Sequence, residues 1–147
     1  LVHNAVVPLD DAGTRFLHRK GAAPTDGPLA LIPGSRGART WLVRPTAVSR
    51  DWEHSALSLA HGAGRKWRRA DCKAKLERRT TAQELTRTAF GSRVICGDRQ
   101  LLWEEAPPAY KDVDRVVLDL AAWGLCVPVA AFEPVLTFKT AREGGDE

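Results

Sequence analysis

The chain has 147 residues, of which 22 are Lys or Arg and 18 are Asp or Glu, so its formal net charge is +4. This length suits one small domain, and an apolar content of 44% is too high for a disordered chain. No apolar run approaches the roughly 20 residues that a membrane-spanning helix needs. Three Cys without CxxC spacing argue against a disulfide framework or a zinc knuckle and favour a reducing cytoplasm. The sequence begins at Leu and contains no Met, so we expect a piece of a longer protein.

The first half of the sequence predicts short strands after an irregular start. Residues 1–28 are punctuated by Gly and Pro and are expected to be loop-like. Two apolar runs, at residues 29–32 and 41–44, are bounded by turn residues and predict a strand–loop–strand unit. Residues 55–60 alternate between apolar and polar and predict a third strand.

The middle of the chain is expected to form helices. Residues 66–79 contain neither Pro nor Gly and carry apolar residues at roughly helical spacing, which predicts one helix. Thr81 and Glu84 have the spacing of a capping box, so a second helix should begin there and end near Phe90. A strand should follow at residues 93–96.

The clearest element of the sequence is an amphipathic helix at residues 112–123, with Gly124 as its natural stop. Residues 125–138 are apolar and interrupted by proline, which is typical of an edge or bulged strand. The polar tail at residues 140–147 is expected to be disordered. The predicted fold is therefore mixed α+β, in a single partial domain over residues 1–147.

Positive charge is concentrated after His61. Residues 61–79 contain eight basic side chains against Asp71 and Glu77, a local net charge of +6. Such an excess predicts a phosphate-binding face, because Lys and Arg neutralise a nucleic-acid backbone without reading its sequence. The alternative is a solvated helix face. The basic residues are Arg65, Lys66, Arg68, Arg69, Lys73, Lys75, Arg78 and Arg79.

The loop PGSRGART, residues 33–40, predicts an anion-binding turn. Its glycines allow successive backbone N–H groups to curl into a nest, and Ser35 and Thr40 add hydroxyl donors. Arg36 and Arg39 add forked guanidinium groups that suit phosphate. The spacing is not that of a Walker loop, and a plain surface turn is the alternative.

The motif HGAGR begins at His61. Its small residues would let a ligand approach the backbone closely, and a neutral imidazole can attack a phosphoryl centre. Arg65 would then clamp a phosphate. The alternative is a structural histidine beside a glycine turn. His3 and Asn4 are a weaker pair, since one histidine is not a metal site, and Lys139 by itself suggests a surface lysine.

Six segments, taken together and in order, resemble the RtcB family of RNA ligases, which join RNA ends using GTP and manganese. They are HN at residues 3–4, HRKGA at 18–22, IPGSRG at 32–37, HGAGR at 61–65, AYKDVD at 109–114, and Lys139.

The resemblance implies roles for these residues. His61 would be the nucleophile that carries a covalent guanylate, His3 a manganese ligand, and Asn4 a neighbour of the nucleotide. Tyr110 and Lys139 would lie near the guanine. The other nucleotide contacts that it implies are Pro33, Gly34, Ser35, Arg36, Thr40, Gly62, Ala63 and Gly64.

The resemblance also implies a reaction. GMP passes from the histidine to an RNA 3′-phosphate and is displaced by the 5′-hydroxyl of a second RNA; 2′,3′-cyclic phosphate ends are first opened. The chain resembles only the C-terminal part of the family, so we expect the remaining metal ligands on a missing N-terminal segment and no full ligation by these residues alone. The alternative is a non-catalytic nucleotide- or RNA-binding remnant.

The loop reads PGSRG where many members of the family have PGSMG. This departure resembles a divergent bacterial branch that sits beside a release-factor-like protein and is thought to repair damaged ribosomal RNA.

Overall fold

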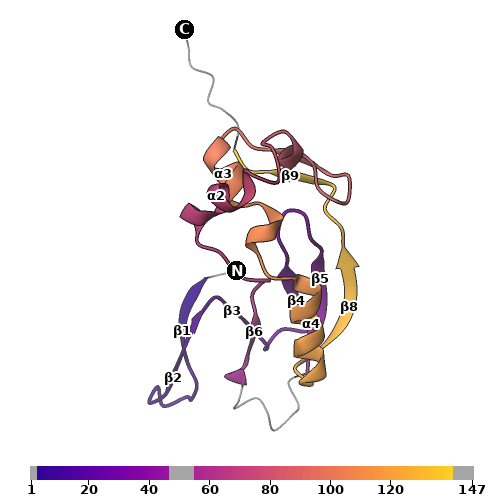
Figure 1. The fold of residues 1–147 in the computed structure, drawn as a ribbon. Coiled ribbons are helices and arrows are strands. Elements are labelled where there is room, and N and C mark those ends of the chain that lie inside the picture. Colours follow the sequence, from indigo (N-terminus) through magenta and orange to yellow (C-terminus); the bar gives the residue numbers. More distant parts are fainter. Residues whose placement is uncertain (1–2, 47–54, 141–147) are drawn as a thin grey trace.

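The computed structural model describes residues 3–46 and 55–140 (Figure 1). The strands are β1 (Asn4–Pro8), β2 (Phe16–Lys20), β3 (Ala22–Pro24), β4 (Ala30–Pro33), β5 (Thr40–Pro45), β6 (Ser58–Ala60), β7 (Arg93–Ile95), β8 (Cys126–Phe132) and β9 (Leu136–Phe138). The helices are α2 (Cys72–Leu76), α3 (Arg99–Glu104) and α4 (Val113–Ala122), with short 3₁₀ turns at Arg69–Asp71, Glu84–Thr86 and Pro107–Ala109. The mixed α+β class is confirmed.

One core lies between α4 and the antiparallel sheet β4–β5–β8. Ile32 and Val43 from the sheet and Val113 and Val117 from the helix are almost completely buried. Asp112 caps α4 by accepting a hydrogen bond from the Asp114 N–H (2.9 Å), and Gly124 ends it with φ of +69°. This helix–sheet layer holds the β4–β5 loop in place.

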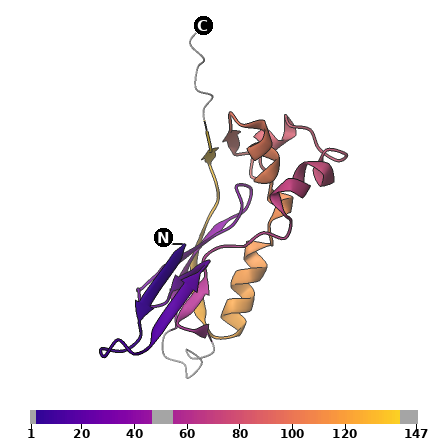
Figure 2. The same ribbon diagram turned by 90° about the vertical axis from the view of Figure 1, so that its left-hand side faces the viewer.

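A second core forms a helical lobe, defined here as α2, α3, β7, β9 and the turns between them. Its buried residues are Leu76, Leu85, Val94, Leu102, Trp103 and Ala106. The strands β7 and β9 pair in parallel, so residues 136–138 are tied to this lobe. Figure 2 shows the lobe beyond the N-terminal end of α4.

The expectation that residues 1–28 are loop-like is wrong. Strand β1 pairs with β2 and β3 pairs with β6, both antiparallel, and Gly13 and Gly21 adopt positive φ at the turns. The strands are short and have one exposed face, where Val6 and Phe16 are 64% and 61% exposed. Two-stranded ribbons bury little on either face, so apolar and polar residues alternate only weakly along their strands. The glycines therefore dominate the sequence pattern and make it look like a loop.

The predicted helix at residues 66–79 is only partly formed. The backbone N–H groups of Lys66 and Trp67 both donate to the Ala109 carbonyl, at 2.9 and 3.3 Å, which holds them beside the 107–109 turn and out of a helix. The helix is therefore restricted to α2. This is a tertiary contact that overrides local spacing.

The predicted second helix is also shorter than expected. The capping box forms, since Thr81 N–H donates to Glu84 (2.7 Å) and Glu84 N–H donates to the Thr81 hydroxyl (3.3 Å). However, Arg87 is already extended and bridges Arg93, so a single 3₁₀ turn results. The sequence pattern did not predict α3, whose start is marked by Asp98 accepting from the Leu101 N–H.

The other strand predictions are confirmed to within a few residues by β4, β5, β6 and β7. Strand β8 lies at the edge of its sheet, and its register with β5 shifts between Leu42 and Val43, as expected of a bulged edge. Within the described ranges, no helix is long and apolar enough to cross a membrane. Apart from Thr140, the predicted tail lies outside the described residues.

Candidate functional site

The β4–β5 loop and the β8–β9 segment line an open cavity of 260 Å³. The pairing of Thr40 with Phe132 brings these distant segments together. Five of its lining residues are expected from the sequence to contact a nucleotide, and the cavity is called the nucleotide cavity below after that expectation: Gly34, Ser35, Arg36, Thr40 and Lys139. Five lining residues were not singled out from the sequence: Ala38 within the loop, and Phe132, Glu133, Pro134 and Thr137, which lie in the last, apolar stretch.

Arg36 is the most unusual residue of this loop. It is only 8% exposed, and its single recorded hydrogen bond runs from Nη2 to the Leu85 carbonyl (3.3 Å). Within the described residues, its Nε and Nη1 atoms are buried without a partner. Burial lowers the pKa of this guanidinium. The loop is therefore not a plain surface turn, because it carries a buried cation with unused donors at its centre.

Arg39 does not behave as the phosphate clamp that the sequence suggested. Its guanidinium is bound to Asp114 (3.0 Å) and to Glu133 (3.2 Å), and these contacts, led by the Glu133 hydrogen bond, raise its pKa. Asp114 also accepts a hydrogen bond from Trp41 Nε1 (2.7 Å). Arg39 thus fastens the loop to α4 and to the opposite wall of the nucleotide cavity.

His61 lies next to His3. The two imidazole rings meet edge to face, with centroids 5.0 Å apart. Gly21, from the turn between β2 and β3, lies against both rings: a Cβ built there would be 3.4 Å from His61 Cε1 and 3.8 Å from His3 Nε2. The HN, HRKGA and HGAGR segments therefore converge at one point.

The backbone of HGAGR connects this histidine pair to the nucleotide cavity. The Ala63 N–H donates to the Pro33 carbonyl (2.9 Å), one residue before the cavity-lining Gly34. A Cβ at Gly62 would approach the same carbonyl to 3.0 Å, so a glycine permits this close contact. On the other side, the Gly64 carbonyl accepts from the Lys111 N–H (2.9 Å).

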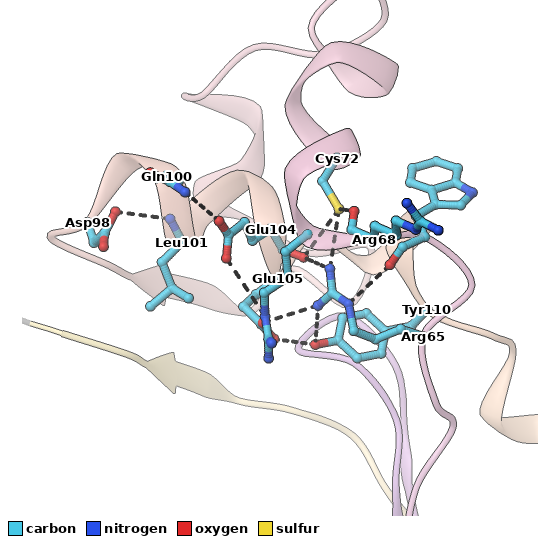
Figure 3. Close-up of polar contacts among 11 residues, drawn as sticks. Arg65, Arg68, Cys72, Asp98, Gln100, Leu101, Glu104, Glu105 and Tyr110 are labelled. Atoms are coloured by element: carbon cyan, nitrogen blue, oxygen red, sulfur yellow. Dashed lines mark hydrogen bonds and ion pairs between the residues drawn. The ribbon is translucent and has the colours of Figure 1, made fainter.

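Arg65 is an internal anchor and not an exposed phosphate clamp (Figure 3). Its Nη1 donates to Glu105 (3.1 Å) and to the Tyr110 hydroxyl (2.9 Å), and its Nη2 donates to the Glu104 carbonyl (2.6 Å). Tyr110 in turn donates its hydroxyl proton to Glu105. This network fixes HGAGR to the helical lobe.

The network also determines where Tyr110 lies. Burial, followed by its hydrogen bond to Glu105, raises the pKa of the phenol above its ordinary value of 10.0. Tyr110 therefore keeps its proton at neutral pH and uses it within the network. It does not line the nucleotide cavity beside Lys139.

The described residues contain no group of three or more His, Cys, Asp and Glu side chains that could hold a metal ion. His3 and His61 are suitable nitrogen donors, but a third donor does not join them in this part of the chain. A manganese site is thus not completed by the residues described.

Comparison with known proteins agrees with these motifs. A family model described as "tRNA-splicing ligase RtcB" matches residues 1–140. The chain belongs to the RtcB family. An RNA-splicing ligase RtcB2 from Escherichia coli is 55% identical over 126 residues, which cover 86% of this chain and 32% of the relative. A tRNA-splicing ligase RtcB from Methanopyrus kandleri is 39% identical over 107 residues (71% and 10%), and one from Archaeoglobus fulgidus is 35% identical over 133 residues (81% and 27%).

The chain therefore spans about a third or less of the length of these RtcB relatives. Within that share, the structure brings the family-like segments into two adjoining groups, the histidine pair and the nucleotide cavity. Asn4 begins strand β1 directly after His3.

Proposed function

We propose that the chain carries the guanylate-accepting part of a GTP- and manganese-dependent RNA ligase, with His61 as the nucleophile. One observation carries this proposal: five of the residues expected to contact the nucleotide line a single cavity, and the Ala63–Pro33 hydrogen bond ties the cavity loop to HGAGR.

In the first step, an imidazole nitrogen of His61 attacks the α-phosphorus of GTP. A nitrogen–phosphorus bond forms, the bond from the α-phosphorus to the bridging oxygen breaks, and pyrophosphate leaves with the electron pair. Gly62 and Ala63 join the histidine to the PGSRG loop, and Gly64, where a Cβ would meet nothing within 4 Å, leaves room for the phosphates beside the backbone. Lys139 and the donors of the PGSRG loop hold the nucleotide.

In the later steps, the guanylate passes to an RNA 3′-phosphate, and the 5′-hydroxyl of a second RNA displaces GMP. A 2′,3′-cyclic phosphate is opened to the 3′-phosphate beforehand. These steps rest on the resemblance and on family membership.

Manganese requires more ligands than the described residues gather. His3 and His61 supply imidazole nitrogens, which suit transition metals. We propose that further ligands come from polypeptide outside these 147 residues, and that the chain alone does not complete ligation.

Two further expectations belong to the same proposal. The cysteines Cys72, Cys96 and Cys126 are free, which supports a reducing cytoplasm. A release-factor-like partner remains a prediction from the PGSRG loop.

Equilibrium binding of GTP tests the nucleotide cavity. Lys139→Ala and Thr40→Val should each weaken GTP binding by roughly tenfold, since each removes one polar contact. The matched control is Lys75→Ala on α2, where the lysine forms an exposed pair with Asp71 (3.7 Å) and lies outside the cavity lining. Equal affinity in all three variants would refute this site.

The second candidate is a non-catalytic nucleotide- or RNA-binding remnant of the fold. The incomplete metal site within the described residues favours it. RNA binding with a steep salt dependence and no response to GTP would support this alternative.

A further inference from the structure

A second, larger cavity of 590 Å³ lies in the helical lobe, between α2 and α3. Its lining includes three cationic side chains, from Arg69, Lys73 and Arg99. It shares no residue with the nucleotide cavity. Two of these cations, Arg69 and Lys73, belong to the basic segment at residues 61–79. The third, Arg99, lies on α3, which the sequence pattern did not predict.

The charge of this basic cavity is only partly compensated. Arg69 Nε is 3.8 Å from a Glu104 oxygen and 3.7 Å from a Glu105 oxygen, both long contacts. Glu104 also accepts a hydrogen bond from Gln100 (2.7 Å). Within residues 3–46 and 55–140, no ion pair is recorded for Lys73 or Arg99, and both are exposed. The lining therefore holds three cations against one carboxylate, that of Glu104.

The shape of the basic cavity suits a chain of phosphates with sugars. Its volume falls within the range of about 300–1,000 Å³ that is usual for ligand pockets. Ala70, Ala82 and Trp103 form an apolar wall. Trp103 is only 8% exposed and belongs to the second core, so little of its ring is available for base stacking.

We propose that the basic cavity binds the phosphodiester backbone of the RNA substrate, at a distance from the guanylate. This inference rests on the proposed function and adds to it a docking site for the strand. Exposed cations on the same segment extend the positive surface beyond the cavity: Arg68, Lys75, Arg78 and Arg79. Backbone contacts of this kind position a strand without selecting its sequence.

The test compares two double variants of equal charge. Lys73→Gln/Arg99→Gln neutralises the basic cavity, and Arg44→Gln/Arg115→Gln removes two exposed cations from β5 and α4. Binding of a fluorescent single-stranded RNA to the 147-residue chain is measured by anisotropy over a range of salt concentrations. The cavity variant should bind roughly tenfold more weakly, with a salt slope flatter by about 1.4, which corresponds to two lost phosphate contacts. The control variant should match the parent chain.

A crosslinking measurement localises the contact. A photoreactive p-benzoylphenylalanine in place of Ala70, inside the cavity, should crosslink the RNA, whereas the same group in place of the exposed Ala122 on α4 should not. The proposal is overturned if both double variants lose RNA affinity equally, if only position 122 crosslinks, or if the parent chain does not bind RNA. It is also overturned if polyglutamate displaces the labelled RNA as effectively as unlabelled RNA does.

Guanylylation of His61 is measured on the same variants after each is joined to the part of the Escherichia coli RtcB2 relative that this chain does not match, and it separates this inference from the proposed function. If the cavity variant keeps the guanylate label and loses RNA affinity, both the docking site and the proposed function are supported. Label retained with RNA affinity unchanged overturns the docking site alone, and absence of label in the parent protein counts against the proposed function.

Discussion

His3 and His61 meet edge to face at 5.0 Å although they belong to different strand pairs. His3 precedes β1, and His61 follows β6, so this contact joins the β1–β2 strand pair to the β3–β6 strand pair. The His3 carbonyl accepts a hydrogen bond from the Gly21 N–H (3.0 Å), which places Gly21 against both rings. The geometry of the proposed nucleophile, His61, thus depends on a turn far from it in sequence.

Replacing Gly21 should impair His61 specifically. Gly21 and Gly13 have the same φ of +64°, but a Cβ at Gly13 meets nothing within 4 Å. Asn tolerates this conformation better than most residues, so Gly21→Asn and Gly13→Asn should lose similar, small amounts of stability. Only Gly21→Asn should reduce guanylylation, by roughly tenfold, because its side chain displaces the imidazoles. Equal labelling of the two variants would contradict this role.

Arg36→Met should stabilise the fold while weakening GTP binding. The substitution removes a buried guanidinium with two unpartnered atoms, which should raise the free energy of unfolding by about 1–3 kcal/mol. The control Arg39→Met removes the ion pairs of a side chain that is 37% exposed. It should lower the free energy of unfolding by under about 1 kcal/mol. Urea unfolding measures the free energy of unfolding of both variants. A destabilised Arg36→Met chain would show that the guanidinium is satisfied in solution.

Glu105→Gln should destabilise the chain markedly. The Glu105 and Arg65 side chains are 13% and 20% exposed, so the change leaves a largely buried cation without its carboxylate, at a cost of about 2–3 kcal/mol. The exposed pair Arg115–Asp119 provides the control, since Asp119→Asn should change stability by under about 0.5 kcal/mol. Similar unfolding midpoints for the two variants would disprove the anchoring role of Arg65.

Tyr110 should titrate above pH 10. It is the one tyrosine in the sequence, so tyrosinate absorbance reports it alone. Because its folded pKa is raised, the neutral phenol stabilises the fold below pH 10, and this contribution is lost as the pH rises through the folded pKa. In Glu105→Gln the pKa should move back toward 10. An unshifted titration in the parent chain would contradict the buried network.

Elements with strong local signals were predictable from sequence. The helix at residues 112–123 has apolar residues at regular helical spacing, a capping Asp and a terminal Gly, and α4 matches it closely. The strands around the PGSRG loop were equally clear. The N-terminal ribbons and α3 were missed, because their stability comes from pairing and from the second core and not from their own residue pattern.

The candidate site was partly predictable for the same reason. Motifs identified the PGSRG loop, HGAGR and Lys139, but not that Glu133 and Thr137 complete the cavity, which depends on the β5–β8 register. The arginines show the limit most clearly. Composition suggested that Arg36, Arg39 and Arg65 bind phosphate, whereas in the fold two of them are fixed by carboxylates and Arg36 is buried.

The most direct test of the central claim uses GTP labelled at the α-phosphate, with manganese. The parent sequence and His61→Ala are each joined to the part of the Escherichia coli RtcB2 relative that these 147 residues do not match. The account predicts an acid-labile protein adduct on the parent that is absent from His61→Ala. No adduct on the parent, or an adduct that persists in His61→Ala, would contradict His61 as the guanylylated nucleophile.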